Sequence, residues 1–171
     1  MNYENIKIIK CDITTLEVEA IVNAANNSLL GGGGVDGAIH NAAGPELLEK
    51  CRLLNGCKDG EAKITKGYNL KAKYVIHTVA PKWYDNRIEN KEELLRSCYI
   101  NSYKLAKDNN IKTIAFPCIG MGVYACPLEI GTKISIEEAI NNNSNFSKIY
   151  LVCFNDKEYD YYLEYFNKIN S

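Results

Sequence analysis

Short apolar runs alternate with longer amphipathic stretches along this chain. The runs are four to seven residues long, which is typical of strands buried in a sheet. The stretches carry apolar residues three and four positions apart, as in helices that pack on one face. We therefore expect strands at residues 6–10, 18–23, 62–65, 73–79, 112–116 and 148–154, and helices at 35–43, 46–54, 89–108, 128–141 and 156–169, with Asp156 as the N-cap of the last.

Strands that alternate with helices predict an α/β domain of three layers. The 171 residues suffice to bury a core without a disulfide or a metal, and neither a repeat nor a linker divides them, so we expect residues 1–171 to form a single domain. Ligands of such domains bind beyond the carboxyl ends of the strands. The expected strand ends lead into residues 23–27, 80–83, 117–124 and 154–156, so two glycine-rich loops lie on this edge.

Four consecutive glycines, Gly31 to Gly34, are the most unusual feature of the chain. Glycine loses the most conformational entropy on folding, so this run indicates unusual dihedral angles or a bare backbone beside a ligand. Free N–H groups there and in the first turn of the following helix would attract an anion, most often phosphate. The simpler interpretation is a flexible turn. A dinucleotide fingerprint at residues 32–37 is discounted, because residues 26–30 separate it from the preceding strand.

Polar side chains flank the glycines. Asn23 and Asn26 offer a donor and an acceptor each, which suits ribose hydroxyls, although asparagine at a strand end also forms turns. Asp36 is either a helix N-cap or a carboxylate that binds a hydroxyl or activates a water. His40 follows one helical turn later and can share the face of Asp36.

Two residues at other strand ends have the same ambiguity. Asp12 can accept a hydrogen bond from an exocyclic amine of a base, or simply form a turn. Phe154 can stack on a base, or belong to the core. The two histidines, His40 and His77, have no partner at zinc-ligand spacing, which argues against a metal site.

Charge and cysteine content narrow the function classes. The formal net charge is −1, with 20 basic and 21 acidic residues intermixed, which argues against nucleic acid as a partner. The seven cysteines form no C-x-x-C pair, and we interpret them as reduced thiols of a cytoplasmic protein. The first residues carry no export signal, and no apolar run reaches the length that spans a membrane.

The motifs resemble the macrodomain family, in particular its MacroD-type branch, which includes bacterial O-acetyl-ADP-ribose deacetylases. The resemblance covers nearly the whole chain and rests on two long motifs, Asn-Ala-Ala-Asn at residues 23–26 and Gly-Gly-Gly-Gly-Val-Asp-Gly-Ala-Ile-His at residues 31–40. Further matches are Cys-Asp-Ile-Thr at 11–14, Ala-Ala-Gly-Pro at 42–45, His-Thr-Val at 77–79, Gly-Val-Tyr at 122–124 and Val-Cys-Phe at 152–154. The family implies a three-layer α/β/α fold with a mixed central sheet.

The resemblance also implies an ADP-ribose cleft, whose ligands are ADP-ribose, O-acetyl-ADP-ribose and ADP-ribosylated proteins. Asp12 and Ile13 would hold the adenine, and Phe154 would stack on it. Asn23, Asn26 and Asp36 would attend the distal ribose, with Asp36 as the activating carboxylate and His40 and Tyr124 in support. Either this carboxylate or a phosphate of the ligand would take the proton of the water. The loops around the diphosphate would supply Gly31, Gly32, Gly33, Gly34 and Val35 on one side and Cys118, Gly120, Met121, Gly122, Val123 and Tyr124 on the other.

The function implied is hydrolysis, without a metal or cofactor, of the ester that joins ADP-ribose to an acetyl group or to an Asp or Glu side chain. The alternative is a reader that binds ADP-ribose without cleaving it. One departure from the family pattern bears on this choice, because relatives usually carry Ser-Thr-Gly where this chain has Gly120, Met121 and Gly122. A second, milder departure is Ala80, where relatives commonly have glycine.

Overall fold

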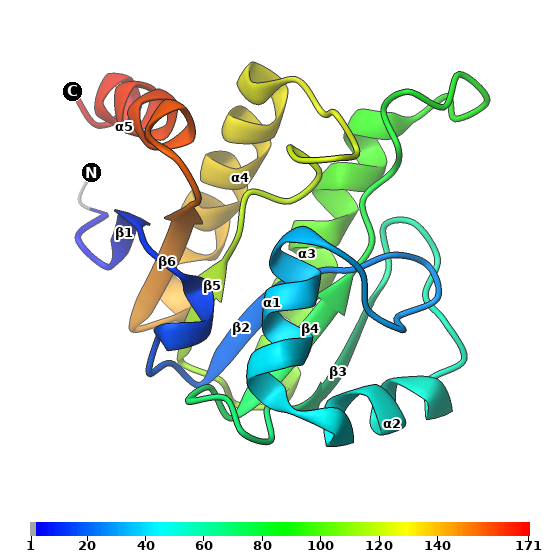
Figure 1. The fold of residues 1–171 in the computed structure, drawn as a ribbon. Helices are drawn as coiled ribbons and strands as arrows, with labels where there is room; N and C mark the ends of the chain where they lie inside the picture. The colour runs from blue at the N-terminus through cyan, green and yellow to red at the C-terminus, as the bar shows by residue number, and fades with distance from the viewer. Residues whose placement is uncertain (1–2) are drawn as a thin grey trace.

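The computed structural model describes residues 3–171 and alternates strands with helices (Figure 1). The strands are β1 (Ile6–Lys10), β2 (Ala20–Ala24), β3 (Ala62–Lys66), β4 (Tyr74–Thr78), β5 (Thr113–Phe116) and β6 (Lys148–Cys153). The α-helices are α1 (Gly34–Ala43), α2 (Pro45–Leu53), α3 (Lys91–Asp108), α4 (Leu128–Asn142) and α5 (Asp156–Asn170), and the short 3-10 helices are η1 (Ile13–Thr15) and η2 (Asn143–Asn145).

The six strands form one mixed sheet in the order β1-β6-β5-β2-β4-β3. Every neighbouring pair is parallel except β3 and β4, which are antiparallel. Helices α1 and α2 cover one face of the sheet, and α3, α4 and α5 cover the other (Figure 1). The predicted three-layer α/β/α fold with a mixed central sheet is confirmed.

The central strands are apolar on both faces because helices cover both. On β2, Ile21 packs with the cluster under α1 and α2, whereas Val22 packs with the cluster under the other three helices. Val75 and Ile76 on β4 divide in the same way. All four side chains are fully buried, and each contributes about 1.5 to 3 kcal/mol through removal of apolar surface from water.

The helix beginnings differ in two informative places from the sequence expectation. Asp156 is not the N-cap of α5, because Asn155 holds that position, with an extended backbone and a side-chain oxygen that accepts the N–H of Glu158 at 2.9 Å. Asp36 is not an N-cap either, because α1 begins at Gly34 and Gly33 caps it. The carboxylate of Asp36 is therefore left for other contacts.

The remaining general features concern the thiols, membranes and metals. All seven cysteines are free thiols. Within residues 3–171, no helix is long and apolar enough to cross a membrane. The same stretch of chain contains no group of three or more His, Cys, Asp or Glu side chains arranged to hold a metal ion.

Candidate functional site

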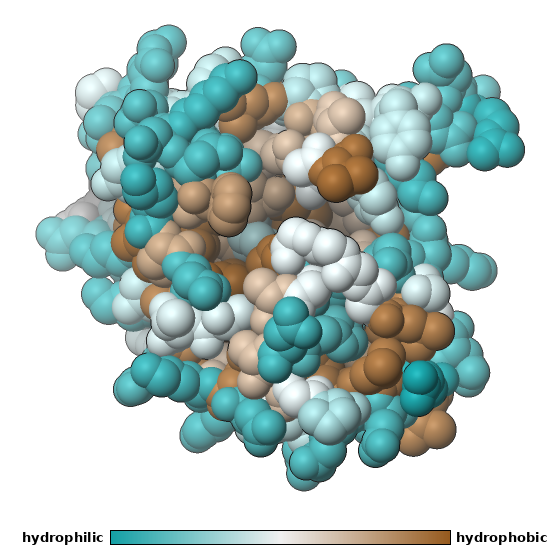
Figure 2. All heavy atoms as spheres, viewed as in Figure 1, coloured by the Kyte–Doolittle hydropathy of each residue, from teal (hydrophilic) through white to brown (hydrophobic). Residues whose placement is uncertain are grey.

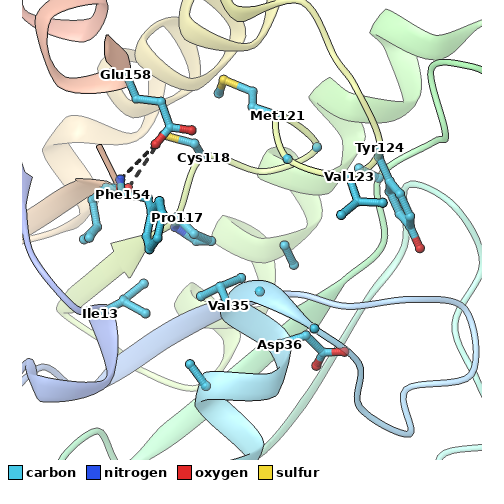
Figure 3. A pocket seen from close by; sticks show the side chains of 18 of the residues that line it. Ile13, Val35, Asp36, Pro117, Cys118, Met121, Val123, Tyr124, Phe154 and Glu158 are labelled. Atoms are coloured by element: carbon cyan, nitrogen blue, oxygen red, sulfur yellow. Dashed lines mark hydrogen bonds between the residues drawn. The ribbon is translucent and has the colours of Figure 1, made fainter. Parts of the chain in front are cut away.

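A cavity of about 1010 Å³ opens at the carboxyl ends of the strands, between the two glycine-rich loops. Figure 2 shows it as a hollow with largely apolar walls. In Figure 3, Phe154 and Ile13 lie at one end, and Asp36 and Tyr124 at the other. Its lining contains all but three of the predicted site residues, namely Asp12, Ile13, Asn26, Gly32, Gly33, Gly34, Val35, Asp36, Cys118, Gly120, Met121, Gly122, Val123, Tyr124 and Phe154.

The three predicted site residues outside this lining are Asn23, Gly31 and His40. Asn23 is fully buried and touches the carboxylate of Asp36. His40 lies close to that carboxylate as well, and a Cβ at Gly31 would lie 3.7 Å from the ring of His40. The structure thus places these three residues behind the wall of the cavity, in contact with residues that form it.

The first glycine loop is held by the side chain of Asn26. Its amide nitrogen donates to the carbonyl of Gly31 at 2.9 Å, while its oxygen accepts from the hydroxyl of Ser28 at 2.7 Å and from the N–H of Leu29 at 3.2 Å. Gly31 and Gly34 adopt φ values of +89° and +57°, which other residues rarely adopt. These contacts and dihedral angles give the loop a defined structure, in contrast to the flexible turn of the simpler interpretation. Asn26 also forms the turn contacts that are common for asparagine at a strand end.

Helix α1 begins at this loop and points its first turn at the cavity. Gly34, Val35 and Asp36 occupy the first three positions of the helix, where a backbone N–H has no acceptor within the helix. All three residues line the cavity. Free N–H groups and the positive end of the helix dipole together favour an anion at this point.

Close packing of α1 on the loop sets where the loop lies. A Cβ atom at Gly37 would come within 2.5 Å of the carbonyl oxygen of Gly32. Only glycine at position 37 therefore allows the helix to lie this close to the loop.

The carboxylate of Asp36 is buried at the inner end of the cavity, with 5% of the residue exposed. The amide nitrogen of Asn23 donates to its Oδ1 at 2.8 Å, and Nε2 of His40 lies 3.5 Å from the same oxygen. Burial raises the pKa of Asp36, and the hydrogen bond from Asn23 and the proximity of His40 partly oppose that rise. The predicted sharing of one helix face by Asp36 and His40 is confirmed.

The second loop, residues 117–126, closes the opposite side of the cavity. Gly120 has φ of +78°, and its carbonyl accepts the N–H of Cys126 at 2.9 Å. The carbonyl of Tyr124 accepts the N–H of Trp83 at 2.8 Å, which joins this loop to the segment that follows β4. Met121 packs against Gly131 on α4, so closely that a Cβ at position 131 would lie 2.7 Å from its sulfur. Glycine at 120 thus provides a backbone conformation, and methionine at 121 provides an anchor on α4.

At the far end of the cavity, Phe154 is 88% exposed, so the alternative that it belongs to the core is excluded. Asp12 caps η1 by accepting the N–H of Thr14 at 3.0 Å, which is the turn interpretation, and it still lines the cavity. Glu158 on α5 accepts the N–H of Phe154 at 2.8 Å (Figure 3). This bond fixes the backbone that carries the aromatic ring.

Sequence reasoning missed several lining residues. Glu158 looked like one of many polar positions on a surface helix, and only its contact with Phe154 distinguishes it. Five more lining residues lie in the strand-end segments where the sequence predicts ligands to bind, namely Ala24, Ala25, Ala80, Pro117 and Asn155. The remaining ones lie outside those segments and are Lys10, Cys11, Ala38 and Val152.

Comparison with known proteins agrees with this geometry. The family model described as the Macro domain matches residues 22–135. The O-acetyl-ADP-ribose deacetylase 1 of Pantoea vagans is 47% identical over 171 residues, which cover 96% of this chain and 99% of that protein. The ADP-ribose glycohydrolase MACROD2 of Homo sapiens is 48% identical over 172 residues, which cover 98% of this chain and 40% of that protein.

A solved structure has the same fold. The macrodomain of Trypanosoma brucei in complex with ADP-ribose superimposes with a TM-score of 0.87 at 40% sequence identity, over 95% of this chain and 69% of that one. The family model spans well over half of the present chain, and the relatives exceed 45% identity over nearly all of it. The chain therefore belongs to the macrodomain family.

Proposed function

We propose that this protein binds ADP-ribose in the cavity and hydrolyses esters of ADP-ribose without a metal. The substrates would be O-acetyl-ADP-ribose and proteins that carry mono-ADP-ribose on Asp or Glu side chains. The observation that carries the proposal is the buried carboxylate of Asp36, held by Asn23 and placed directly beside backbone N–H groups that favour an anion. The names of the two relatives, a deacetylase and a glycohydrolase of ADP-ribose, support it.

The shape of the cavity suits an extended dinucleotide-like ligand. An exposed aromatic ring, Phe154, and the carboxylate of Asp12 stand at one end, where an adenine would stack and donate its amine. The two glycine-rich loops flank the middle, where a diphosphate would meet main-chain N–H groups. Asp36 lies at the other end, where the distal ribose would bind (Figure 3).

The proposed chemistry is acyl transfer to water. Asp36 takes a proton from a water, and the oxygen of that water attacks the acyl carbon. The bond from that carbon to the ribose oxygen then breaks, and the ribose oxygen leaves with the proton that Asp36 returns. Burial raises the pKa of Asp36, which makes its carboxylate a stronger base than an exposed aspartate. The diphosphate, held at a fixed distance along the cleft, keeps the ester in place, so orientation supplies a large part of the rate.

The test is product release from O-acetyl-ADP-ribose by the purified protein, followed by chromatography of ADP-ribose, for wild type and for Asp36→Asn and Asn23→Ala. A general base contributes about 10² to 10⁴ in rate, so we expect kcat of Asp36→Asn to fall by at least about 100-fold. Calorimetry with ADP-ribose is the control, because Asp36→Asn keeps the shape of the side chain and should leave the cleft able to bind.

Two outcomes would contradict the proposal. Undiminished turnover in both variants would remove the mechanism assigned to Asp36 and Asn23. Tight ADP-ribose binding by a wild-type protein that cleaves no ester would favour the reader function instead.

The partner we propose is a protein that carries ADP-ribose on an Asp or Glu side chain. Such a side chain would present its ester at the Asp36 end of the cleft.

A further inference from the structure

Three polar side chains lie side by side in the interior of the sheet, beneath Asp36. Asn23 on β2 is directly paired with His77 on β4 in the strand register, and both are fully buried. Thr65 on the neighbouring edge strand β3 is 4% exposed. A buried polar group without a hydrogen bond destabilises the fold, so the contacts among these three side chains decide how each is oriented.

The contacts form a continuous chain that leads to the carboxylate. The amide nitrogen of Asn23 donates to Oδ1 of Asp36 at 2.8 Å and lies 3.2 Å from Nδ1 of His77. Nε2 of His77 lies 3.0 Å from the hydroxyl of Thr65. That hydroxyl donates to the carbonyl of Lys66 at 3.0 Å.

The donors and acceptors of this hydrogen-bond network indicate the tautomer of His77. Thr65 has one hydroxyl hydrogen and gives it to a carbonyl, so towards His77 it can only accept. Nε2 of His77 therefore carries the ring hydrogen, and Cys51 Sγ, 3.9 Å from the same nitrogen, is a weaker contact. Burial lowers the pKa of His77 to about 3, so the ring is neutral and its Nδ1 is an acceptor.

An acceptor at Nδ1 in turn fixes the amide of Asn23. One N–H of the amide goes to Asp36 and the other to His77, and both need the nitrogen on this side. A flipped amide would place its oxygen against the carboxylate and against a ring nitrogen that has no hydrogen. In the present orientation, Oδ1 of Asn23 is buried and has no hydrogen-bond partner within residues 3–171.

We propose that His77 is a positioning residue for the hydrolysis, which acts through Asn23. Its Nδ1 accepts one N–H of the amide, so that the other N–H of the same nitrogen is directed at Oδ1 of Asp36 and orients the carboxylate. This role rests on the proposed function, because it concerns the same carboxylate.

Two variants of similar chemistry separate positioning from packing. In His77→Asn, the amide places an oxygen near the position of Nδ1, where it can accept from Asn23. In His77→Gln, the amide reaches the position of Nε2, so the contact with Thr65 is kept and that with Asn23 is lost. We expect kcat to fall by roughly tenfold or more for His77→Gln and by less than about threefold for His77→Asn, with KM little changed in both.

A purely structural role predicts the opposite order. Glutamine is closer to histidine in volume than asparagine is, so it would leave the smaller cavity and be the milder change in stability and in kcat. Unfolding in urea, measured for both variants, separates packing from positioning. A kcat for His77→Gln equal to or above that of His77→Asn would overturn the proposal.

The tautomer provides a readout that does not depend on activity. The chain has two histidines, so a histidine-labelled sample gives two ring systems in a long-range ¹⁵N–¹H spectrum, and the His77→Asn sample assigns them. We expect His77 at neutral pH to show a protonated Nε2 and an unprotonated Nδ1. A hydrogen on Nδ1 would overturn the inference. If the wild type cleaves no ester, the proposed function fails, while this spectrum still upholds or overturns the orientation of Asn23.

Discussion

The substitution Gly37→Ala tests how α1 positions the first glycine loop, residues 31–34. In the interior of a helix, alanine in place of glycine ordinarily stabilises by about 0.8 to 1 kcal/mol. Here the new Cβ would lie 2.5 Å from the carbonyl oxygen of Gly32, whereas real Cβ contacts are at least 3.0 Å, so helix and loop must separate by half an ångström or more.

The expected magnitude follows from two opposing terms. Overpacking costs about 1 to 3 kcal/mol, from which the gain in helix propensity of about 1 kcal/mol is subtracted. We therefore expect the free energy of unfolding of Gly37→Ala to fall by up to about 2 kcal/mol. The affinity for ADP-ribose should fall by at least about tenfold, because the moving group is the backbone of the loop itself.

Urea unfolding and calorimetry with ADP-ribose measure the two effects, and Gly122→Ala is the matched control. Gly122 lies in the opposite loop of the same cavity, without positive φ, and a Cβ there would meet nothing within 4 Å. The free energy of unfolding of Gly122→Ala should lie within about 0.5 kcal/mol of that of wild type. If Gly37→Ala were as stable as the propensity scale predicts and bound ADP-ribose like wild type, the close approach of α1 would not determine the loop.

Three further outcomes follow from the structure. The pKa of His77 is about 3 in the folded protein and 6.5 in the unfolded chain, so the unfolded chain takes up a proton first as pH falls. Between pH 7 and pH 5, the free energy of unfolding of wild type, measured in urea, should therefore fall by about 2 kcal/mol relative to that of His77→Gln. An unchanged difference between the two proteins would contradict a buried neutral ring. Phe154→Ala should bind ADP-ribose about tenfold more weakly by calorimetry at unchanged stability, since its ring is 88% exposed, and equal affinity would exclude stacking. Arg96→Met should lower the free energy of unfolding by about 2 to 3 kcal/mol, because it leaves the buried carboxylate of Glu138 without the guanidinium 2.8 Å away. The double variant Arg96→Met with Glu138→Gln should recover most of this loss, and no recovery would exclude the charge of Glu138 as its cause.

Much of the fold could be predicted from local pattern. Every predicted strand and α-helix is present, because buried runs and amphipathic stretches have different periods and glycine or proline separates them. The choice of N-cap on α5 was wrong because Asn155 and Asp156 are adjacent and both are good caps, and only the extended backbone at Asn155 distinguishes them. A local pattern does not determine such a choice.

The site could be predicted where its residues are close in sequence. Asp36 and His40 are one helical turn apart, so their shared face was visible before the structure. His77 and Thr65 were not, because they reach Asn23 only through the pairing of β2 with β4 and of β4 with β3. In the sequence, His77 is merely a histidine without a zinc partner, and its contacts depend on strand order, which hydrophobic periodicity does not encode.

The positions of the Asp36 carboxylate and of the first glycine loop are linked through α1. Asp36 lies in the first turn of that helix, and Gly37, the next residue, packs on the carbonyl of Gly32 in the loop. The loop is also held from β2 by Asn26, and the carboxylate is held from β2 by Asn23. A displacement of α1 away from the sheet would therefore change both ends of the site at once, so a substitution that moves the helix should weaken binding and turnover together, whereas one at His77 should alter turnover alone.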